Sequence, residues 1–317
     1  MQPDRYEVSS AGRQRVTGLI QRRGATPGIP PAMGFIFGGL FVAAGVWIVL
    51  MGVGVVKTDS ASVHAPYWVL TAAGSSFLLG GLFVWSLAAT ELITRAKIKR
   101  LLPEHHGEPA FADYPWDPRQ FQVSEWKDTA KAFAFAIGVT VFLSVFNWWA
   151  FVAGGAWMVK VIVVIFDVFL LILWWQAARQ LGRAVKFGKS RILFDQFPFR
   201  PGQPVSISWQ PGRGIHQVMK GRFTLRCIEQ WIEIERVGRK RHSSVKQDCL
   251  WSAAWVLEQP RNFLIGDSVE LRYELPGDAP TTSLSSPRAI FWELSVRLEL
   301  PGLDFQKTYL VPVYSRV

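Results

Sequence analysis

Four long apolar runs occupy the first part of the chain. They cover residues 34–56, 67–89, 132–153 and 157–178. Each run reaches the roughly 20 residues that an α-helix needs to cross the hydrocarbon core of a bilayer. Backbone amides in lipid have no water to bond, so each run is expected to be helical. The pattern predicts four transmembrane helices arranged as two hairpins.

A different pattern begins near residue 190, where apolar residues recur at every second position. Val205, Ile207 and Trp209 alternate with polar residues, and further alternating segments are 223–227, 232–235, 269–275 and 292–300. Such alternation is typical of half-buried antiparallel strands. Turn signals such as Pro-Gly separate the segments, so we expect a two-sheet β-sandwich.

The fold class is therefore a membrane α + β chain, with four helices followed by a cytosolic antiparallel sandwich. Its expected parts are a basic N-terminal segment (1–33), a first transmembrane hairpin (34–90), a connection (91–131), a second hairpin (132–180) and the sandwich (190–317).

The join between the two patterns contains a Gly-Lys-Ser sequence that resembles the end of a nucleotide-binding phosphate loop. That loop requires G-x-x-x-x-G-K-[ST] between a strand and a helix. Here five residues separate Gly182 from Gly188, a helix precedes the motif and a strand-like segment follows it. Spacing and context both fail, so the two glycines are expected to loosen the chain where the fourth helix ends.

Basic residues predict which side of the membrane each connection occupies, because Lys and Arg near membrane helices stay in the cytoplasm. They gather before the first helix, after the second and after the fourth, whereas the two intervening turns carry few. Both termini and the connection 91–131 are expected to be cytoplasmic. Much of the formal net charge of +11 would then lie beside anionic membrane lipids.

Two stretches of the sandwich region, FPFRPGQPVSISW (197–209) and IFWELSVRLELPGLDFQKTYLVPVY (290–314), resemble arrestin-like sandwiches. The YPWD sequence at 114–117, followed by Trp126 and an apolar hairpin, resembles a group of uncharacterised bacterial inner-membrane proteins. The resemblance implies a multi-pass protein of the bacterial inner membrane with a cytosolic recognition module of arrestin-like or immunoglobulin-like type. It brings no catalytic residues.

The second predicted hairpin contains a candidate polar cluster, formed by Asn147, Lys160 and Asp167. A charged residue at the centre of a membrane helix is costly and is often functional. The three residues are candidates for carrying protons or ions. The alternative is a tie between helices or an anchor to a partner subunit, with Lys160 reaching outward to the interface.

Small residues recur at helix-packing spacing in the first hairpin, as Gly34 and Gly38 in one helix and Ser76 and Gly80 in the next. Such spacing lets helices approach closely. It favours either packing of these two helices on each other or association with another membrane protein, including a second copy of the chain.

Two further features are candidates for lipid or partner contact. One is a basic loop between strands, and the other is the pair Trp116 and Trp126, which need apolar cover from the membrane surface or the sandwich. Because the loop is tethered at the membrane, headgroup contact is favoured over nucleic acid. The basic loop residues are Arg236, Arg239, Lys240 and Arg241.

Metal and cofactor chemistry find little support. His105 and His106 stand between two glutamates, but adjacent histidines rarely converge on one ion and the H-E-x-x-H spacing is absent. Cys227 and Cys249 are the two cysteines, too few for a four-ligand zinc site, and are expected to be reduced and buried. No metal or cofactor is expected.

The leading functional hypothesis is a non-enzymatic, membrane-anchored adaptor or accessory subunit that presents its sandwich to a protein partner. Membrane lipids and an unidentified membrane or cytosolic protein are the expected partners. The first alternative is a transport or proton-conducting component that uses Asp167. The second is a membrane enzyme at the cytosolic face, acting through His105 and His106.

Overall fold

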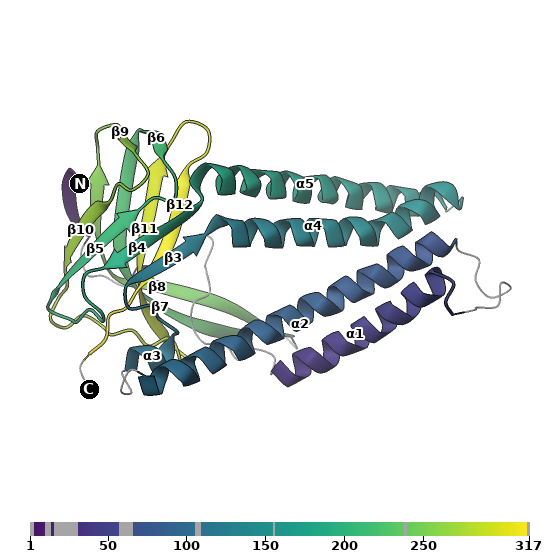
Figure 1. The fold of residues 1–317 in the computed structure, drawn as a ribbon, viewed down its shortest axis with the longest axis horizontal. Coiled ribbons are helices and arrows are strands. Elements are labelled where there is room, and N and C mark those ends of the chain that lie inside the picture. Colours follow the sequence, from purple (N-terminus) through teal and green to yellow (C-terminus); the bar gives the residue numbers. More distant parts are fainter. Residues whose placement is uncertain are drawn as a thin grey trace. The chain divides into compact units, whose positions relative to one another are not determined.

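The computed structural model describes residues 3–9, 14–15, 31–56, 66–104, 109–154, 156–237 and 240–315. The chain forms two compact units (Figure 1). The strand-rich unit combines Met1–Thr26, Ala96–Glu125 and Arg183–Val317, and the helical unit combines Pro27–Arg95 and Trp126–Gly182.

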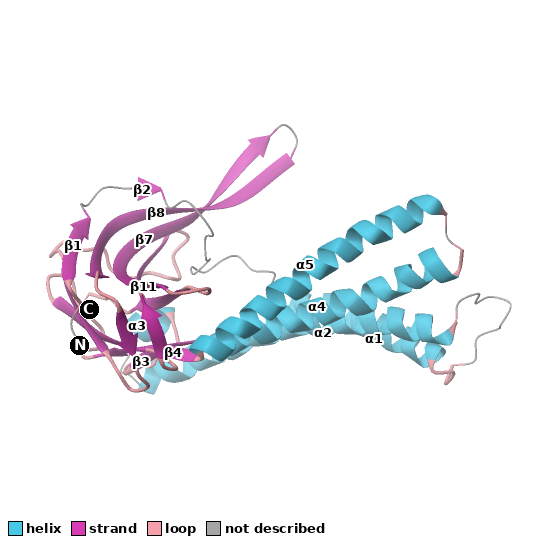
Figure 2. Cartoon of the chain, turned by 90° about the horizontal axis from the view of Figure 1, so that it is seen from above, coloured by secondary structure: helices cyan, strands magenta, loops and turns pink. Residues whose placement is uncertain are grey.

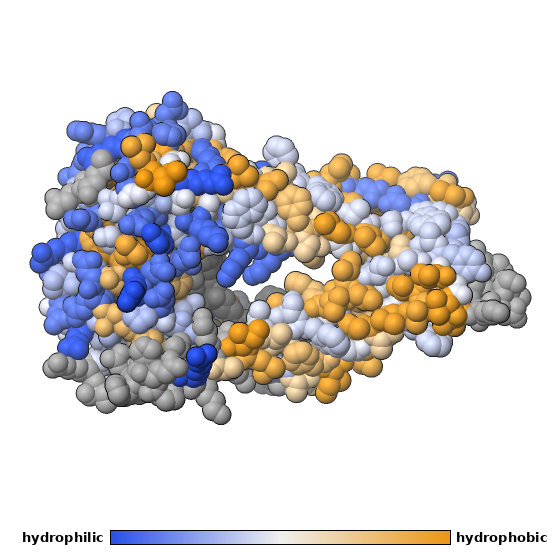
Figure 3. Space-filling model, viewed as in Figure 1, coloured by the Kyte–Doolittle hydropathy of each residue, from blue (hydrophilic) through white to orange (hydrophobic). Residues whose placement is uncertain are grey.

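The predicted set of four long apolar helices is confirmed. They are α1 (Pro31–Gly52), α2 (Tyr67–Glu104), α4 (Glu125–Asn147) with its π-helical continuation η1 (Trp148–Val152), and α5 (Trp157–Phe187). All four are long and apolar enough to cross a membrane. Apolar and weakly polar residues cover most of the visible surface of the helices, whereas hydrophilic residues cover most of the visible strand-rich surface (Figure 3). Such an apolar exterior suits lipid and not water.

Two helices end well beyond the residue that the hydropathy pattern predicts. Helix α2 continues to Glu104, into the predicted connection, and α5 continues through Gly182 to Phe187. These extensions are rich in Lys and Arg, which lower hydropathy without breaking a helix. The connection also holds the short helix α3 (Pro109–Asp113).

Glycines set the contact between α1 and α2. A Cβ atom added to Gly38 would lie 2.9 Å from the carbonyl oxygen of Gly81, and one added to Gly45 would lie 2.8 Å from that of Gly74. The spacing of seven residues places each pair of glycines on one helix face. The two backbones therefore touch where side chains are absent, as small residues allow in membrane helices.

Of the two small-residue pairs, the one in α1 packs against α2, whereas the one in α2 does not pack against α1. Gly34 and Gly38 lie in the contact with α2, but an added Cβ at Gly80 would meet nothing within 4 Å. The Ser76 hydroxyl donates to the Ala72 carbonyl within its own helix. Ser76 and Gly80 lie on a different side of α2 from Gly74 and Gly81, because the helix turns by about 100° per residue.

The strands form two main antiparallel sheets, as predicted. The first has the order β1 (Arg5–Ser9), β8 (Lys240–Leu257), β7 (Lys220–Val237), β11 (Ala289–Glu299) and β12 (Phe305–Val311), with β2 (Gln14–Arg15) also paired to β8. The second has the order β10 (Val269–Glu274), β5 (Pro204–Gln210), β4 (Lys189–Phe194) and β3 (Gln120–Ser124). A small pair joins β6 (Ile215–Val218) to β9 (Arg261–Phe263).

The sandwich draws strands from three separate stretches of the chain, and the predicted boundary at residue 190 left out the first two. Strand β1 pairs with β8, from Arg5 opposite Val256 to Ser9 opposite Ser252. Strand β3 pairs with β4, ending at Ser124 opposite Lys189. The segments before α1 and between α2 and α4 therefore each add a strand to one of the two main sheets, whose other strands follow α5.

Large aromatic side chains fill the core between the two main sheets. Trp209, Tyr273 and Tyr309 are fully buried, yet each polar atom has a partner. The Trp209 indole donates to the Tyr309 hydroxyl at 3.2 Å, and Tyr309 donates to Ser190. Tyr273 donates to the Phe223 carbonyl at 2.9 Å. Burial raises the pKa of the Tyr309 and Tyr273 phenols, so both stay neutral donors.

The Gly-Lys-Ser sequence is the end of a helix. Gly188 has φ of +65° and its amide donates to the Ala184 carbonyl at 3.0 Å, as in a left-handed C-terminal cap. Arg213 donates to the Val185 carbonyl at 2.6 Å. Strand β4 begins immediately afterwards, so the helix that a phosphate loop requires is replaced by a strand.

The cap makes Gly188 sensitive to substitution. Gly188→Ala should destabilise the sandwich by roughly 1–2 kcal/mol, because a Cβ atom is disfavoured at positive φ. Gly277→Ala is the matched control, since its added Cβ would meet nothing within 4 Å. Thermal unfolding of the purified protein, followed by near-ultraviolet circular dichroism, should show a lower midpoint for Gly188→Ala alone. Equal midpoints would contradict the cap assignment.

Candidate functional site

A seam of three hydrogen bonds joins α4 to α5. The Thr129 hydroxyl donates to the Gln180 carbonyl at 3.1 Å, and the Trp174 indole donates to the Thr140 hydroxyl at 3.1 Å. The third bond links the predicted polar residues: the Asn147 amide nitrogen donates to Asp167 at 3.0 Å. Each bond satisfies a polar group that would otherwise face a largely apolar environment.

The structure brings Asn147 and Asp167 together, whereas Lys160 forms no hydrogen bond or ion pair with either within the part of the chain that the structure describes. Asp167 lies ten residues into α5, about 15 Å from its first residue at 1.5 Å per residue. Asn147 also donates to the Leu143 carbonyl of its own helix at 3.3 Å. Both amide hydrogens of Asn147 are therefore used, and the arrangement is a tie between helices.

Helix α4 changes its winding directly after Asn147. Residues Trp148–Val152 form the π-helix η1, in which the Ala153 amide donates to the Trp148 carbonyl at 3.0 Å. Single π-helical turns occur often at functional sites because they widen the helix and redirect side chains. The widened turn therefore falls next to the Asn147–Asp167 bond.

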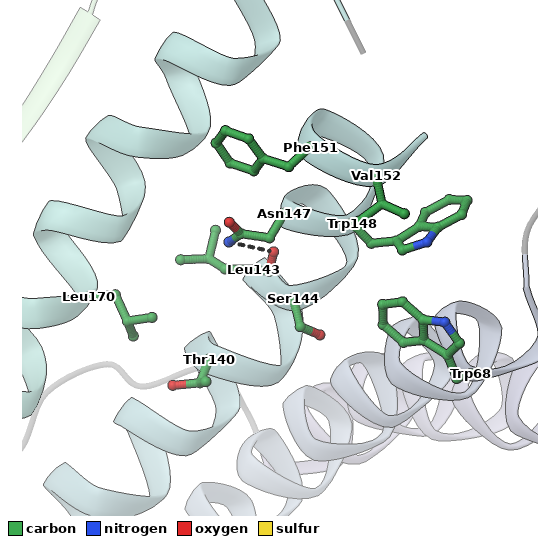
Figure 4. A pocket seen from close by; sticks show the side chains of 9 residues that line it. All are labelled: Trp68, Thr140, Leu143, Ser144, Asn147, Trp148, Phe151, Val152 and Leu170. Atoms are coloured by element: carbon green, nitrogen blue, oxygen red, sulfur yellow. Dashed lines mark hydrogen bonds between the residues drawn. The ribbon is translucent and has the colours of Figure 1, made fainter. Parts of the chain in front are cut away.

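An open hollow of about 500 Å³ lies beside this turn (Figure 4). Helix α2 contributes Trp68, α5 contributes Leu170, and the remaining lining comes from α4 and η1. The α4 and η1 residues are Thr140, Leu143, Ser144, Asn147, Trp148, Phe151 and Val152. Trp68 and Trp148 meet edge to face, with ring centroids 6.0 Å apart. The hollow and the polar seam share Thr140 and Asn147.

Trp116 is 3% exposed and lies inside the strand-rich unit, so its side chain is not available for lipid or partner contact. Its indole donates to the Tyr314 hydroxyl at 3.2 Å. Nearby, Asp113 accepts a bond from the Leu284 amide at 3.1 Å. Of the two placements considered for Trp116, docking against the sandwich is the one found. The Pro-Trp segment fastens the connection between α2 and α4 onto the sheets.

The other predicted contact residues have different outcomes. Trp126 is 42% exposed and stays a candidate for lipid or partner contact. Arg236, Lys240 and Arg241 lie where β7 and β8 pair at their far ends, with Arg236 opposite Arg241. Arg239, His105 and His106 lie outside the described residues. No group of metal-binding side chains occurs among the residues that the structure describes.

The two cysteines follow the expectation of reduced, covered thiols. Cys227 is buried and Cys249 is partly buried, and neither forms a disulfide. Burial raises the pKa of both thiols, so both stay protonated and weakly nucleophilic near neutral pH. This disfavours a role as catalytic nucleophiles.

Strands β7 and β8 run past the end of the neighbouring strand β11. The last pair between β11 and β7 is Ala289 opposite Gln230, yet β7 and β8 stay paired to Val237 opposite Lys240. We call this extension, residues 231–237 with 240–246, the arm; it projects from the sandwich in Figure 2. Among the described strands, none pairs with the outer edge of the arm on the β7 side.

Comparison with known proteins adds little to this geometry. No protein-family model matches the chain, and no curated protein matches it. Among solved structures, the sheets resemble part of Spo0M, a sporulation control protein from Bacillus subtilis, at 12% sequence identity and a TM-score of 0.25. The match covers 40% of this chain and 49% of that one, about half its length. A likeness at this level carries no function.

Sequence reasoning found one of the three seam bonds and missed the other two, as well as the hollow. A signal was available for part of the seam. Asp167 and Trp174 are seven residues apart on α5, as are Thr140 and Asn147 on α4, so each pair shares a helix face. The hollow left no comparable signal because it depends on the approach of Trp68 from a distant helix.

The tie predicts how substitutions at Asp167 behave. Asp167→Asn should leave the stability of the helical unit nearly unchanged, because an amide oxygen still accepts from Asn147. Asp167→Leu loses the bond, which is worth about 0.6 kcal/mol on average between membrane helices. Thermal unfolding in mild detergent should therefore show a lower midpoint only for Asp167→Leu. Equal loss in both variants would show that the negative charge, and not the bond, is what the helices need.

Proposed function

We propose that the protein is a membrane-anchored adaptor or accessory subunit that presents its sandwich to a protein partner. The arm carries this proposal. It extends β7 and β8 past the last residue that β11 pairs with, so most of its backbone contacts are its own. A lone two-stranded hairpin is marginally stable in water. The arm adds little to the core of the sandwich, so a bound partner would supply the contacts that stabilise it.

The chemistry of the arm suits recognition by a protein. Its described base has Trp231 opposite Lys246 and Ile232 opposite Val245. Lys246 pairs with Glu233 at 3.5 Å, and the Arg288 guanidinium lies 5.7 Å from the Trp231 ring. The base therefore offers aromatic, apolar and charged groups together. An unpaired strand edge next to them can accept an extended segment of a partner.

The proposed location is the bacterial inner membrane, with both termini in the cytoplasm. Three stretches of the strand-rich unit are separated by helical hairpins. If the helices span the bilayer, each hairpin crosses it twice, and all three stretches share one side. The basic residues that follow α2 and α5 favour the cytoplasm as that side.

The transport alternative is the second candidate, because a carboxylate does lie deep within α5. Its hydrogen bond to Asn147 favours a structural tie, and no second acidic side chain bonds to this pair among the residues that the structure describes. Ion flux into proteoliposomes should be the same for the wild type and Asp167→Asn. A flux that the substitution abolishes would favour transport over the adaptor.

Crosslinking in native membranes followed by purification tests the adaptor directly. We predict that the amount of crosslinked partner recovered falls at least about tenfold in an arm-shortened variant, in which residues 232–245 are replaced by Asn-Gly. Asn-Gly suits the two-residue turn that would then join Trp231 to Lys246.

The matched control changes a different exposed site on the sandwich, where Leu264 is 60% and Ile265 is 81% exposed. The double variant Leu264→Ser and Ile265→Ser should retain the partner. Near-ultraviolet circular dichroism checks that both variants keep the sandwich. Retention of the partner by the folded, shortened variant would remove the arm from the account.

A further inference from the structure

The hollow beside η1 has walls that are chemically apolar despite its polar residues. Leu143, Phe151, Val152 and Leu170 supply hydrocarbon directly. The polar side chains turn their hydrogens into the protein, as the bonds around Thr140, Ser144 and Asn147 show. The volume of about 500 Å³ lies within the range of about 300–1,000 Å³ that is usual for ligand pockets.

Each polar hydrogen on the α4 wall already has an acceptor. The Thr140 hydroxyl donates to the Ala136 carbonyl at 2.8 Å, and the Ser144 hydroxyl donates to the Val141 carbonyl at 2.7 Å. The Asn147 amide hydrogens go to Leu143 and Asp167. A buried water needs about two to four polar partners, and these walls offer it few. The occupant favoured by the walls is therefore a hydrocarbon chain.

One side of the hollow carries a different chemistry. The indoles of Trp68 and Trp148 lie together there, while Leu170 lies on the other side (Figure 4). Trp68 is the second residue of α2, and η1 ends shortly before α5 begins, so both indoles belong to the turn end of the helices. Neither indole N–H donates to another described residue. Tryptophan at a membrane interface commonly offers this group to polar lipid atoms.

We propose that the hollow binds one glycerolipid of the bilayer. An acyl chain occupies the space between Trp68, Ser144 and Leu170, and ester oxygens at the glycerol end accept hydrogen bonds from the indoles of Trp68 and Trp148. The neighbouring Asn147–Asp167 bond holds α4 against α5 behind the chain. This site is independent of the arm, so the adaptor proposal and the lipid site can fail separately.

The experiment is native mass spectrometry of the full chain, released from mild detergent after stepwise removal of surrounding lipid. The wild type should retain one glycerolipid after the loosely held lipids have gone. Ser144→Leu fills the hollow with a larger side chain and should lower that retention at least about tenfold.

Ser86→Leu is the matched control. Like Ser144, Ser86 lies in a long apolar helix, and its hydroxyl donates to the carbonyl three residues earlier at 2.7 Å. Ser86 does not line the hollow. This control should retain the lipid as the wild type does. Equal loss from both variants, or no retained lipid in the wild type, would show that the hollow holds only annular lipid and would overturn the proposal.

A second pair of variants tests the glycerol end without filling the hollow. Trp68→Phe and Trp148→Phe remove one indole N–H each, so each should weaken retention by about three- to tenfold, as expected for the loss of one hydrogen bond. Unchanged retention in both would refute the assignment of the indoles. A retained mass that is not a glycerolipid would refute the assigned ligand class.

Discussion

Backbone pairing between strands that lie far apart in the chain is the constraint on which the rest of the structure depends. Strand β1 precedes α1, β3 lies between α2 and α4, and both complete sheets whose other strands follow α5. Sheet hydrogen bonds require that all three stretches share one aqueous compartment. If the helices cross a membrane, they must therefore do so in pairs. Strand β3 also runs directly into α4, and β4 starts directly after the Gly188 cap of α5.

The two units are stabilised by different physics. The sandwich buries large aromatic side chains from both sheets and satisfies their polar atoms, as Trp209, Tyr309 and Ser190 show. In a bilayer, burial of apolar side chains does little to hold helices together, because the acyl chains of lipids are equally apolar. The helical unit relies instead on close backbone approach at Gly38 and Gly45 and on the hydrogen bonds between α4 and α5. Within that unit, the Asn147–Asp167 bond and the hollow adjoin, because Asn147 belongs to both.

Much of this architecture follows from the sequence, because hydropathy and periodicity act over short stretches. The four helices and the alternation in β5, β10 and β11 are of this kind. Strands β1 and β3 are short and lie in polar segments, so only their pairing with β8 and β4 makes them strands. The burial of Trp116 and the position of Gly80 depend likewise on what each residue faces in three dimensions. The polar part of the candidate site could be predicted, because Asp167 is conspicuous inside an apolar run. The hollow could not, because it needs Trp68 from another helix.

The shared compartment is tested most directly by labelling single cysteines in intact cells with a membrane-impermeant maleimide. One cysteine is placed in each stretch, at Arg5, Ala112 and Ile265, and one in the short turn before α5, at Ala156, with Cys227 and Cys249 replaced by alanine. The account predicts that Ala156→Cys reacts in intact cells and that the other three react only after the membrane is permeabilised. The paired crossing of the helices would be contradicted if the cysteines at positions 5, 112 and 265 did not all lie on one side of the membrane, with the cysteine at position 156 on the other.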